Sequence, residues 1–94
     1  MNSAKKIEKE LIPQLTFVSY EVLNDAAEKT LRRNQIERAM VLGNADKNKC
    51  KIYFVTEDGL MTVETTVWAA TDDLLTLKGG VNIPVHCIER VELI

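Results

Sequence analysis

The residue types best suited to nucleophilic or metal chemistry are scarce in this chain. Its one histidine, His86, stands next to Cys87, and the other cysteine is Cys50. A nucleophile needs a base close to it in space, and a structural zinc site needs four ligands. Neighbouring residues on a strand also point to opposite faces of a sheet. We therefore expect no catalytic residue, no metal site, no cofactor and no enzymatic activity.

Cys50 and Cys87 have two interpretations, a disulfide or a pair of buried thiols. The charged residues 8–10 follow the start of the chain, where a secretory signal would continue with apolar residues. We therefore expect a cytoplasmic protein that keeps both cysteines as thiols in its core. No apolar run approaches the roughly 20 residues that span a bilayer, so we expect no membrane partner.

Other polar clusters fall in sequences typical of turns. Asp58-Gly59 is a strong hairpin signal, and Asp72-Asp73 follows a threonine. Aspartate is common in turns because its side chain hydrogen-bonds nearby backbone. The segment 78–80, Lys-Gly-Gly, lacks the frame of a nucleotide-binding glycine motif. These residues are expected to be solvated turn residues.

The candidate interaction surface comes from cations and one aromatic residue. Cations are frequent between residues 29 and 51, where they form either one basic patch or the ordinary solvated face of a helix. Trp68 also has two interpretations: it is an exposed interface anchor if the strand alternation is unbroken, or a core residue if the strand bends. The candidate residues are Trp68, Arg32, Arg33, Arg38, Lys47 and Lys49.

Charge is distributed unevenly along the chain. Residues 1–48 have a net charge of +1 and residues 49–94 a net charge of −3, which gives −2 for the whole chain. Non-specific nucleic-acid binding depends on neutralising phosphates with lysine and arginine. The acidic second half therefore disfavours nucleic acid as a partner, unless its few cations cluster on one face.

The chain reads as one domain in three parts. Residues 1–24 form an N-terminal segment. Within it, residues 3–12 are predicted to form a helical turn or two before Pro13, and residues 15–23 fit either a strand or a helix. Residues 25–43 predict a helix that begins at a capping aspartate and ends at Gly43. Its apolar stripe is Leu31, Ile36, Ala39 and Met40.

Residues 49–94 alternate with a period of two and predict strands joined by tight turns. The strands are 49–56, a long and bending 60–70, 74–78, 81–83 and 88–94, with a tight turn at 85–87. Open sheet edges invite pairing with other chains, so short antiparallel strands of this kind are expected to close on themselves. The predicted fold is a mainly β domain, a small five-stranded antiparallel barrel with an N-terminal helix.

This order resembles the small SH3-like barrels and, within them, the Sm-like (LSm) fold, from Cys50 to Ile94. The run from Ile83 to Ile88 resembles the tight turn before the last strand of that fold. Lys78-Gly79 partly matches the loop pairs with which Sm proteins contact RNA. Segments 63–69 and 77–84 also resemble short uncharacterised bacterial proteins, a likeness that implies no function.

Two binding functions follow as hypotheses. The first is a non-enzymatic module that binds a protein partner or self-associates through its edge strands. The alternative, which the Sm-like resemblance implies, is an RNA or other nucleic-acid binder that uses the basic residues around the helix and the 47–51 loop.

Overall fold

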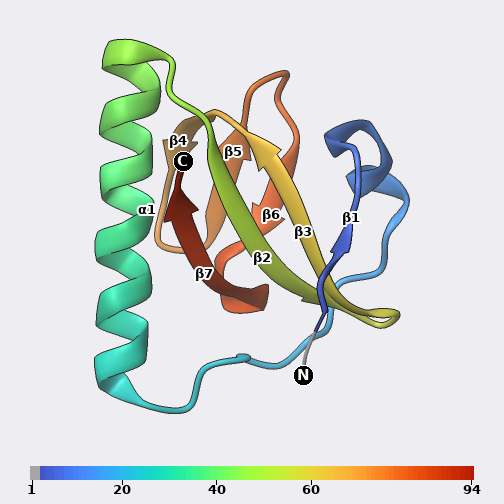
Figure 1. Cartoon of the computed structure of the whole chain (residues 1–94). Coiled ribbons are helices and arrows are strands. Elements are labelled where there is room, and N and C mark those ends of the chain that lie inside the picture. Colours follow the sequence, from blue (N-terminus) through green and yellow to red (C-terminus); the bar gives the residue numbers. More distant parts are fainter. Residues whose placement is uncertain (1–2) are drawn as a thin grey trace.

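One long helix packs beside two small β-sheets in the computed structural model, which describes residues 3–94 (Figure 1). The first sheet has the strand order β1-β3-β2-β7 and the second has the order β4-β5-β6. The elements in chain order are β1 (Lys5–Lys6), the 3-10 helix η1 (Lys9–Gln14), α1 (Ala26–Asp46), β2 (Cys50–Thr56), β3 (Gly59–Thr65), β4 (Val67–Ala70), β5 (Leu74–Leu77), β6 (Asn82–Pro84), the 3-10 helix η2 (Val85–Cys87) and β7 (Ile88–Leu93).

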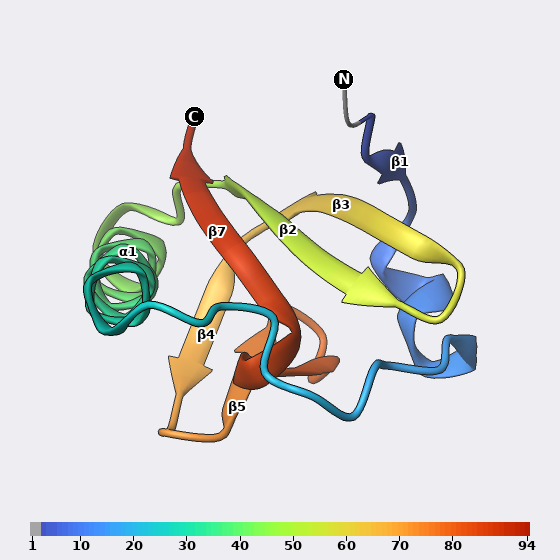
Figure 2. The ribbon, with the colours of Figure 1, turned by 90° about the horizontal axis from the view of Figure 1, so that it is seen from below.

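The helix begins as predicted, with the Asp25 side chain accepting a hydrogen bond from the Ala27 amide at 3.2 Å. Its buried stripe differs from the predicted one. Ile36 and Ala39 are buried, but Leu31 is 57% exposed and Arg32 faces the interior instead. Viewed from below, α1 lies to one side of both sheets, beside β7 and β4 (Figure 2).

The predicted helix end at Gly43 is wrong by three residues. α1 continues to Asp46, and Lys47 takes the left-handed conformation (φ 56°) while its amide donates to the Gly43 carbonyl at 3.0 Å. Gly43 has another role, because a Cβ there would lie 2.6 Å from the Val67 carbonyl oxygen. The absence of a side chain lets the last turns of α1 approach the backbone of β4.

The period-two strands are confirmed, and their register sets which residues are buried. β2 and β3 form an antiparallel hairpin in which Ile52 pairs with Val63 and Phe54 with Met61. β2 also pairs with β7, and the paired Ile52 and Val91 are both buried. The long 60–70 strand bends as predicted, at Thr66, where the chain leaves β3 and enters the second sheet as β4.

The prediction of a closed five-stranded antiparallel barrel is wrong. The strands belong to two sheets, and the first is mixed because β1 pairs in parallel with β3, Lys5 opposite Met61. Within residues 3–94, β7 pairs with no strand on its outer edge. There α1 supplies the partners: Arg32 donates to the Ile88 carbonyl at 3.0 Å, and the Gln35 side chain accepts from the Val91 amide at 2.9 Å. Covering an edge with helix side chains blocks further strand pairing without closing a barrel.

The N-terminal segment crosses the sheets mostly without regular structure of its own. Residues 3–12 contain a two-residue strand before η1, which includes Pro13, rather than the expected helical turns alone. Residues 15–23 are neither strand nor helix; Phe17 forms a single bridge with Thr56, and Val18 is buried. The core lies between α1 and the sheets; its largest fully buried side chains include Phe54, Ile36, Leu75 and Ile83.

Candidate functional site

A cleft of about 620 Å³ opens where the end of α1, the bend at Thr66, the β5–β6 turn and the N-terminal segment meet. This volume falls within the range of about 300–1,000 Å³ typical of ligand pockets. Five lysines line what we call the lysine cleft, together with Trp68, Thr65, Thr66, Gly43, Asn44, Ile7 and three glutamates; the lysines are Lys6, Lys9, Lys47, Lys49 and Lys78. No arginine of the described chain is among its lining residues.

Two hydrogen bonds hold four of these residues near the bend. The Lys78 amide donates to the Thr66 carbonyl at 2.9 Å, and the Asn44 side chain donates to the Trp68 carbonyl at 3.3 Å. Asn44 lies in the last turn of α1, next to the capping Lys47. The β5–β6 turn, β4 and the helix end are therefore fixed relative to one another.

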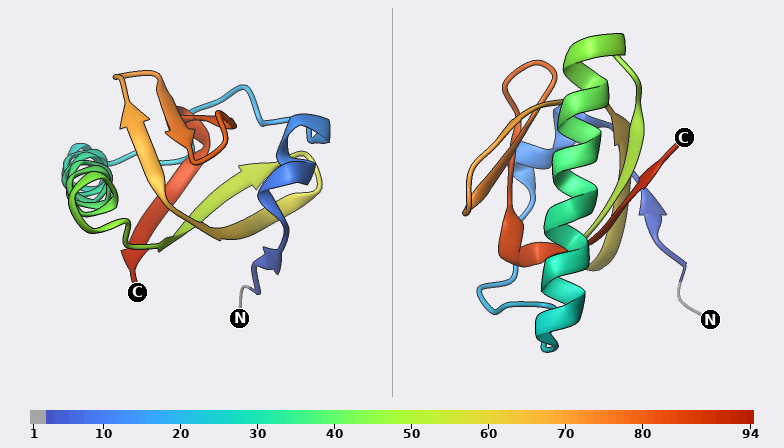
Figure 3. Two further views of the ribbon diagram at one scale, coloured as in Figure 1. Left: turned by 90° about the horizontal axis from the view of Figure 1, so that it is seen from above. Right: turned by 90° about the vertical axis from the view of Figure 1, so that its left-hand side faces the viewer.

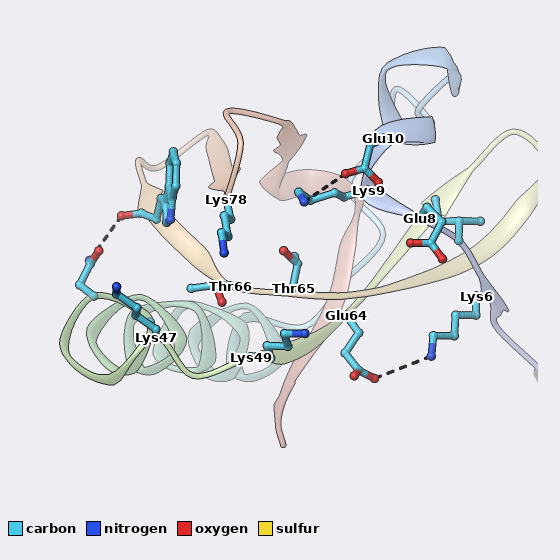
Figure 4. Close-up of a pocket in the computed structure, with 14 residues that line it drawn as sticks. Lys6, Glu8, Lys9, Glu10, Lys47, Lys49, Glu64, Thr65, Thr66 and Lys78 are labelled. Atoms are coloured by element: carbon cyan, nitrogen blue, oxygen red, sulfur yellow. Dashed lines mark hydrogen bonds and ion pairs between the residues drawn. The ribbon is translucent and has the colours of Figure 1, made fainter.

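Lys49 enters the cleft through strand register. It directly precedes Cys50, which pairs with Thr65. Figure 4 shows Lys47 and Lys49 on one side of the hollow and Lys78 on the other, with Thr65 and Thr66 between them. Both threonines are buried at the floor.

Charge divides the cleft into two ends. At the N-terminal end, Lys6 lies 4.0 Å from Glu64 and Lys9 lies 3.1 Å from Glu10, so both cations are compensated (Figure 4). At the other end, Lys47, Lys49 and Lys78 form no ion pair within residues 3–94. We call these three residues, with Trp68, the cationic end. An acidic group can enter there without displacing an existing partner.

Trp68 is exposed, so the interpretation of this residue as core is wrong. Its exposed fraction is 48%, and the neighbouring Val67 is fully buried. The bend restarts the alternation, because Thr65, Thr66 and Val67 are all buried before Trp68 turns outward. Trp68 lies beside the lysines as a result.

The structure brings together half of the predicted interaction residues. Trp68, Lys47 and Lys49 line the cleft, whereas the three helix arginines do not. Arg32 is buried and binds Glu21 through two contacts of 2.7 Å. Arg33 donates to the Thr71 carbonyl at 3.0 Å.

Arg38, the third helix arginine, lies with Val41 along a shallow apolar depression on the outer face of α1. Of the two interpretations of the cations between 29 and 51, one basic patch is therefore wrong, because the three helix arginines lie away from the cleft that Lys47 and Lys49 line.

Three cleft lysines escaped the sequence prediction. Lys6 and Lys9 belong to the segment 3–12, which was expected to form a helical turn or two; β1 pairing with β3 places Lys6 here, and Lys9 follows at the start of η1. For Lys78 the sequence did contain a signal, because this residue directly precedes two glycines. Gly79 and Gly80 both have positive φ and form the tight turn that aims Lys78 across the cleft.

His86 and Cys87 have structural contacts away from the cleft, and the Cys50 thiol, which does not line it, donates to the carbonyl of Thr65 at its floor. The His86 ring and the Cys87 thiol both form hydrogen bonds with the Val18 carbonyl, at 2.8 and 3.2 Å. These two bonds hold the N-terminal segment against η2. Both cysteines are free and buried, as predicted, and burial raises the pKa of each thiol to about 11. A search of residues 3–94 for three or more metal-ligating side chains in one place found none.

Comparison with known proteins found no matching family model, no matching curated protein and no matching solved structure. The likeness to short bacterial proteins therefore stays a prediction. Of the helices in the described chain, none has the length and apolar character needed to cross a membrane.

Proposed function

We propose that this protein is a non-enzymatic binding module of the cytoplasm whose partner places a negatively charged segment in the lysine cleft. The observation that carries the proposal is the cationic end, where Lys47 and Lys49 of the α1–β2 connection and Lys78 of the β5–β6 turn line one cleft without ion pairs among the described residues. A lysine at a helix C-terminus also stabilises the helix dipole. That explanation covers Lys47, but Lys49 and Lys78 lie outside the helix.

The lining chemistry supports binding over catalysis. The ionisable residues in the cleft are lysines and glutamates, and the sole histidine and both cysteines lie elsewhere. The Glu10 carboxylate accepts from its own backbone and from Lys9, and both interactions lower its pKa. A general acid needs the opposite shift.

The chain offers a matched test of this proposal. Changing Lys47, Lys49 and Lys78 together to glutamine removes three charges from the cationic end; changing Lys5, Lys29 and Lys51 to glutamine removes the same charge outside the cleft. We expect polyphosphate and polyglutamate to bind the parent protein at low salt, and the first variant to lose this binding. Equal losses in both variants, or no binding by the parent, would refute the proposal.

A second candidate function is self-association through α1. The helix leaves its outer face uncovered (Figure 3, right), and Leu31 and Val41 on the helix are 57% and 61% exposed. Light scattering coupled to size exclusion tests this: a dimer that Val41→Asp converts to a monomer supports it. Self-association through an edge strand has less support, because α1 covers the outer edge of β7.

A further inference from the structure

Resting on the proposed function, we infer that the ligand of the cationic end is a single-stranded nucleic acid, with its phosphates on Lys47, Lys49 and Lys78 and one base stacked on Trp68. The inference combines two features of the cationic end. The cations are unpaired within the described residues, and an aromatic side chain beside them is half exposed. Proteins that bind single strands combine a cationic groove with an aromatic surface for the bases.

The aromatic surface, rather than the type of cation, favours a nucleic acid over an acidic peptide. Every cation lining the cleft is a lysine, while Arg32 and Arg33 are engaged elsewhere in the fold. Arginine matches both carboxylate and phosphate with two parallel hydrogen bonds, and lysine binds either anion as a compact point charge. An acidic peptide, however, would leave the Trp68 ring without a planar partner.

Trp68 is held in a position from which it can stack. Its carbonyl accepts a hydrogen bond from Asn44, and the preceding Val67 is fully buried against α1, so the backbone under the indole is fixed. A fixed backbone under the indole lowers the entropy that is lost when a base covers the ring. Thr66 also links Trp68 to Lys78: it lies two residues before Trp68, and its carbonyl accepts the hydrogen bond from the Lys78 amide.

The walls of the cleft favour a single strand over a double helix. The N-terminal segment forms one wall, and Lys9 from that wall reaches to within 3.4 Å of where a Cβ at Gly79 would lie. Bases inside a duplex are already stacked on one another, so they are less available to cover an indole than the bases of a single strand. At the other end Lys6 and Lys9 are already paired with Glu64 and Glu10, and Glu8 adds a further negative charge, so the bound segment is confined to a few nucleotides at the cationic end.

The test uses labelled 12-nucleotide oligo(U) and oligo(dT), a duplex of the same length and polyglutamate of equal charge. Binding is followed by anisotropy, and Trp68 fluorescence reports stacking directly because it is the only tryptophan. We expect single strands to bind more tightly than the duplex or polyglutamate and to quench Trp68. Trp68→Ala should weaken single-strand binding roughly 5- to 100-fold, and Trp68→Phe should restore part of it.

Salt dependence supplies an independent readout. Three phosphate contacts predict a slope of about −2 in log affinity against log salt, and each lysine-to-glutamine change at the cationic end should reduce its magnitude by about 0.7. If polyglutamate binds as well as oligo(U) and Trp68→Ala changes neither, the nucleic-acid inference fails while the binding module stands. If no polyanion binds at low salt, both fail.

Discussion

Replacement of Glu21 by glutamine isolates the most buried charge pair in the described chain. Arg32 is 6% exposed and donates to both oxygens of the Glu21 carboxylate at 2.7 Å and to the Ile88 carbonyl. The hydrogen bonds from Arg32 lower the pKa of Glu21 from its ordinary 4.5 to about 2, against the opposing effect of burial. The pair thus links the N-terminal segment, α1 and the covered edge of β7.

The size of the effect follows from this lowered pKa. A fall from 4.5 to about 2 corresponds to at most about 3 kcal/mol of folding free energy. Because 31% of the Glu21 side chain is exposed, solvent screening reduces the expected contribution to roughly 1–2 kcal/mol. The folded-state pKa is the lower one, so this contribution is present above pH 4.5 and is lost as the pH falls towards 2.

Urea unfolding of the parent protein and Glu21→Gln across this pH range measures the contribution. We expect the variant to be less stable by about 1–2 kcal/mol at pH 7 and the difference to shrink steadily below pH 5. Glu57→Gln, in an exposed turn, is the control and should give a small difference that does not change in this way. A Glu21→Gln difference that is absent at pH 7, or that stays constant down to pH 3, would refute the reasoning.

Three further predictions follow from the packing. Gly43→Ala places a Cβ 2.6 Å from the Val67 carbonyl oxygen, so we expect it to lower the free energy of unfolding by about 1–3 kcal/mol; unchanged or higher stability in a denaturant titration would contradict this. Gln35→Ala leaves the Val91 amide of β7 without its partner and should cost about 1–3 kcal/mol, measured by thermal unfolding, with Asn34→Ala on the exposed helix face as the near-neutral control. Cys50 and Cys87, with thiol pKa values of about 11, should resist iodoacetamide at pH 8 until denaturant is added, and rapid labelling of the native protein would show that they are accessible.

Local patterns predicted the elements of the fold well. Alternation located β2 and β3, Asp58-Gly59 located the turn between them, and Asp25 located the start of α1. Each of these signals depends on residues that are neighbours in the chain. The helix end was misplaced because Gly43 is required by contact with β4, which no local pattern reveals.

The arrangement of the sheets depended on long-range contacts that local patterns do not contain. Alternation cannot show that the 60–70 strand changes sheet at Thr66, or that Lys5 pairs in parallel with Met61. Arg32 looked like a surface cation because arginine usually is one. Its burial becomes favourable only through Glu21 and the Ile88 carbonyl, 11 and 56 positions away in the sequence.

The candidate site was predictable only in part for the same reason. Lys47, Lys49 and Trp68 could be singled out by type, but nothing local separates them from Arg38, which faces another side of the molecule. The overall acidity of residues 49–94 argued against a polyanionic ligand. The fold gathers five lysines from four regions of the chain into one cleft, so the local charge there differs from the average.

The most direct measurement of the central claim is an NMR titration of the labelled protein with oligo(U), following every backbone amide and the Trp68 indole. The account predicts shifts that cluster at residues 44–49, 65–68 and 77–80, the segments that form the cationic end. Shifts confined to the outer face of α1, or spread evenly over the exposed lysines, would contradict it.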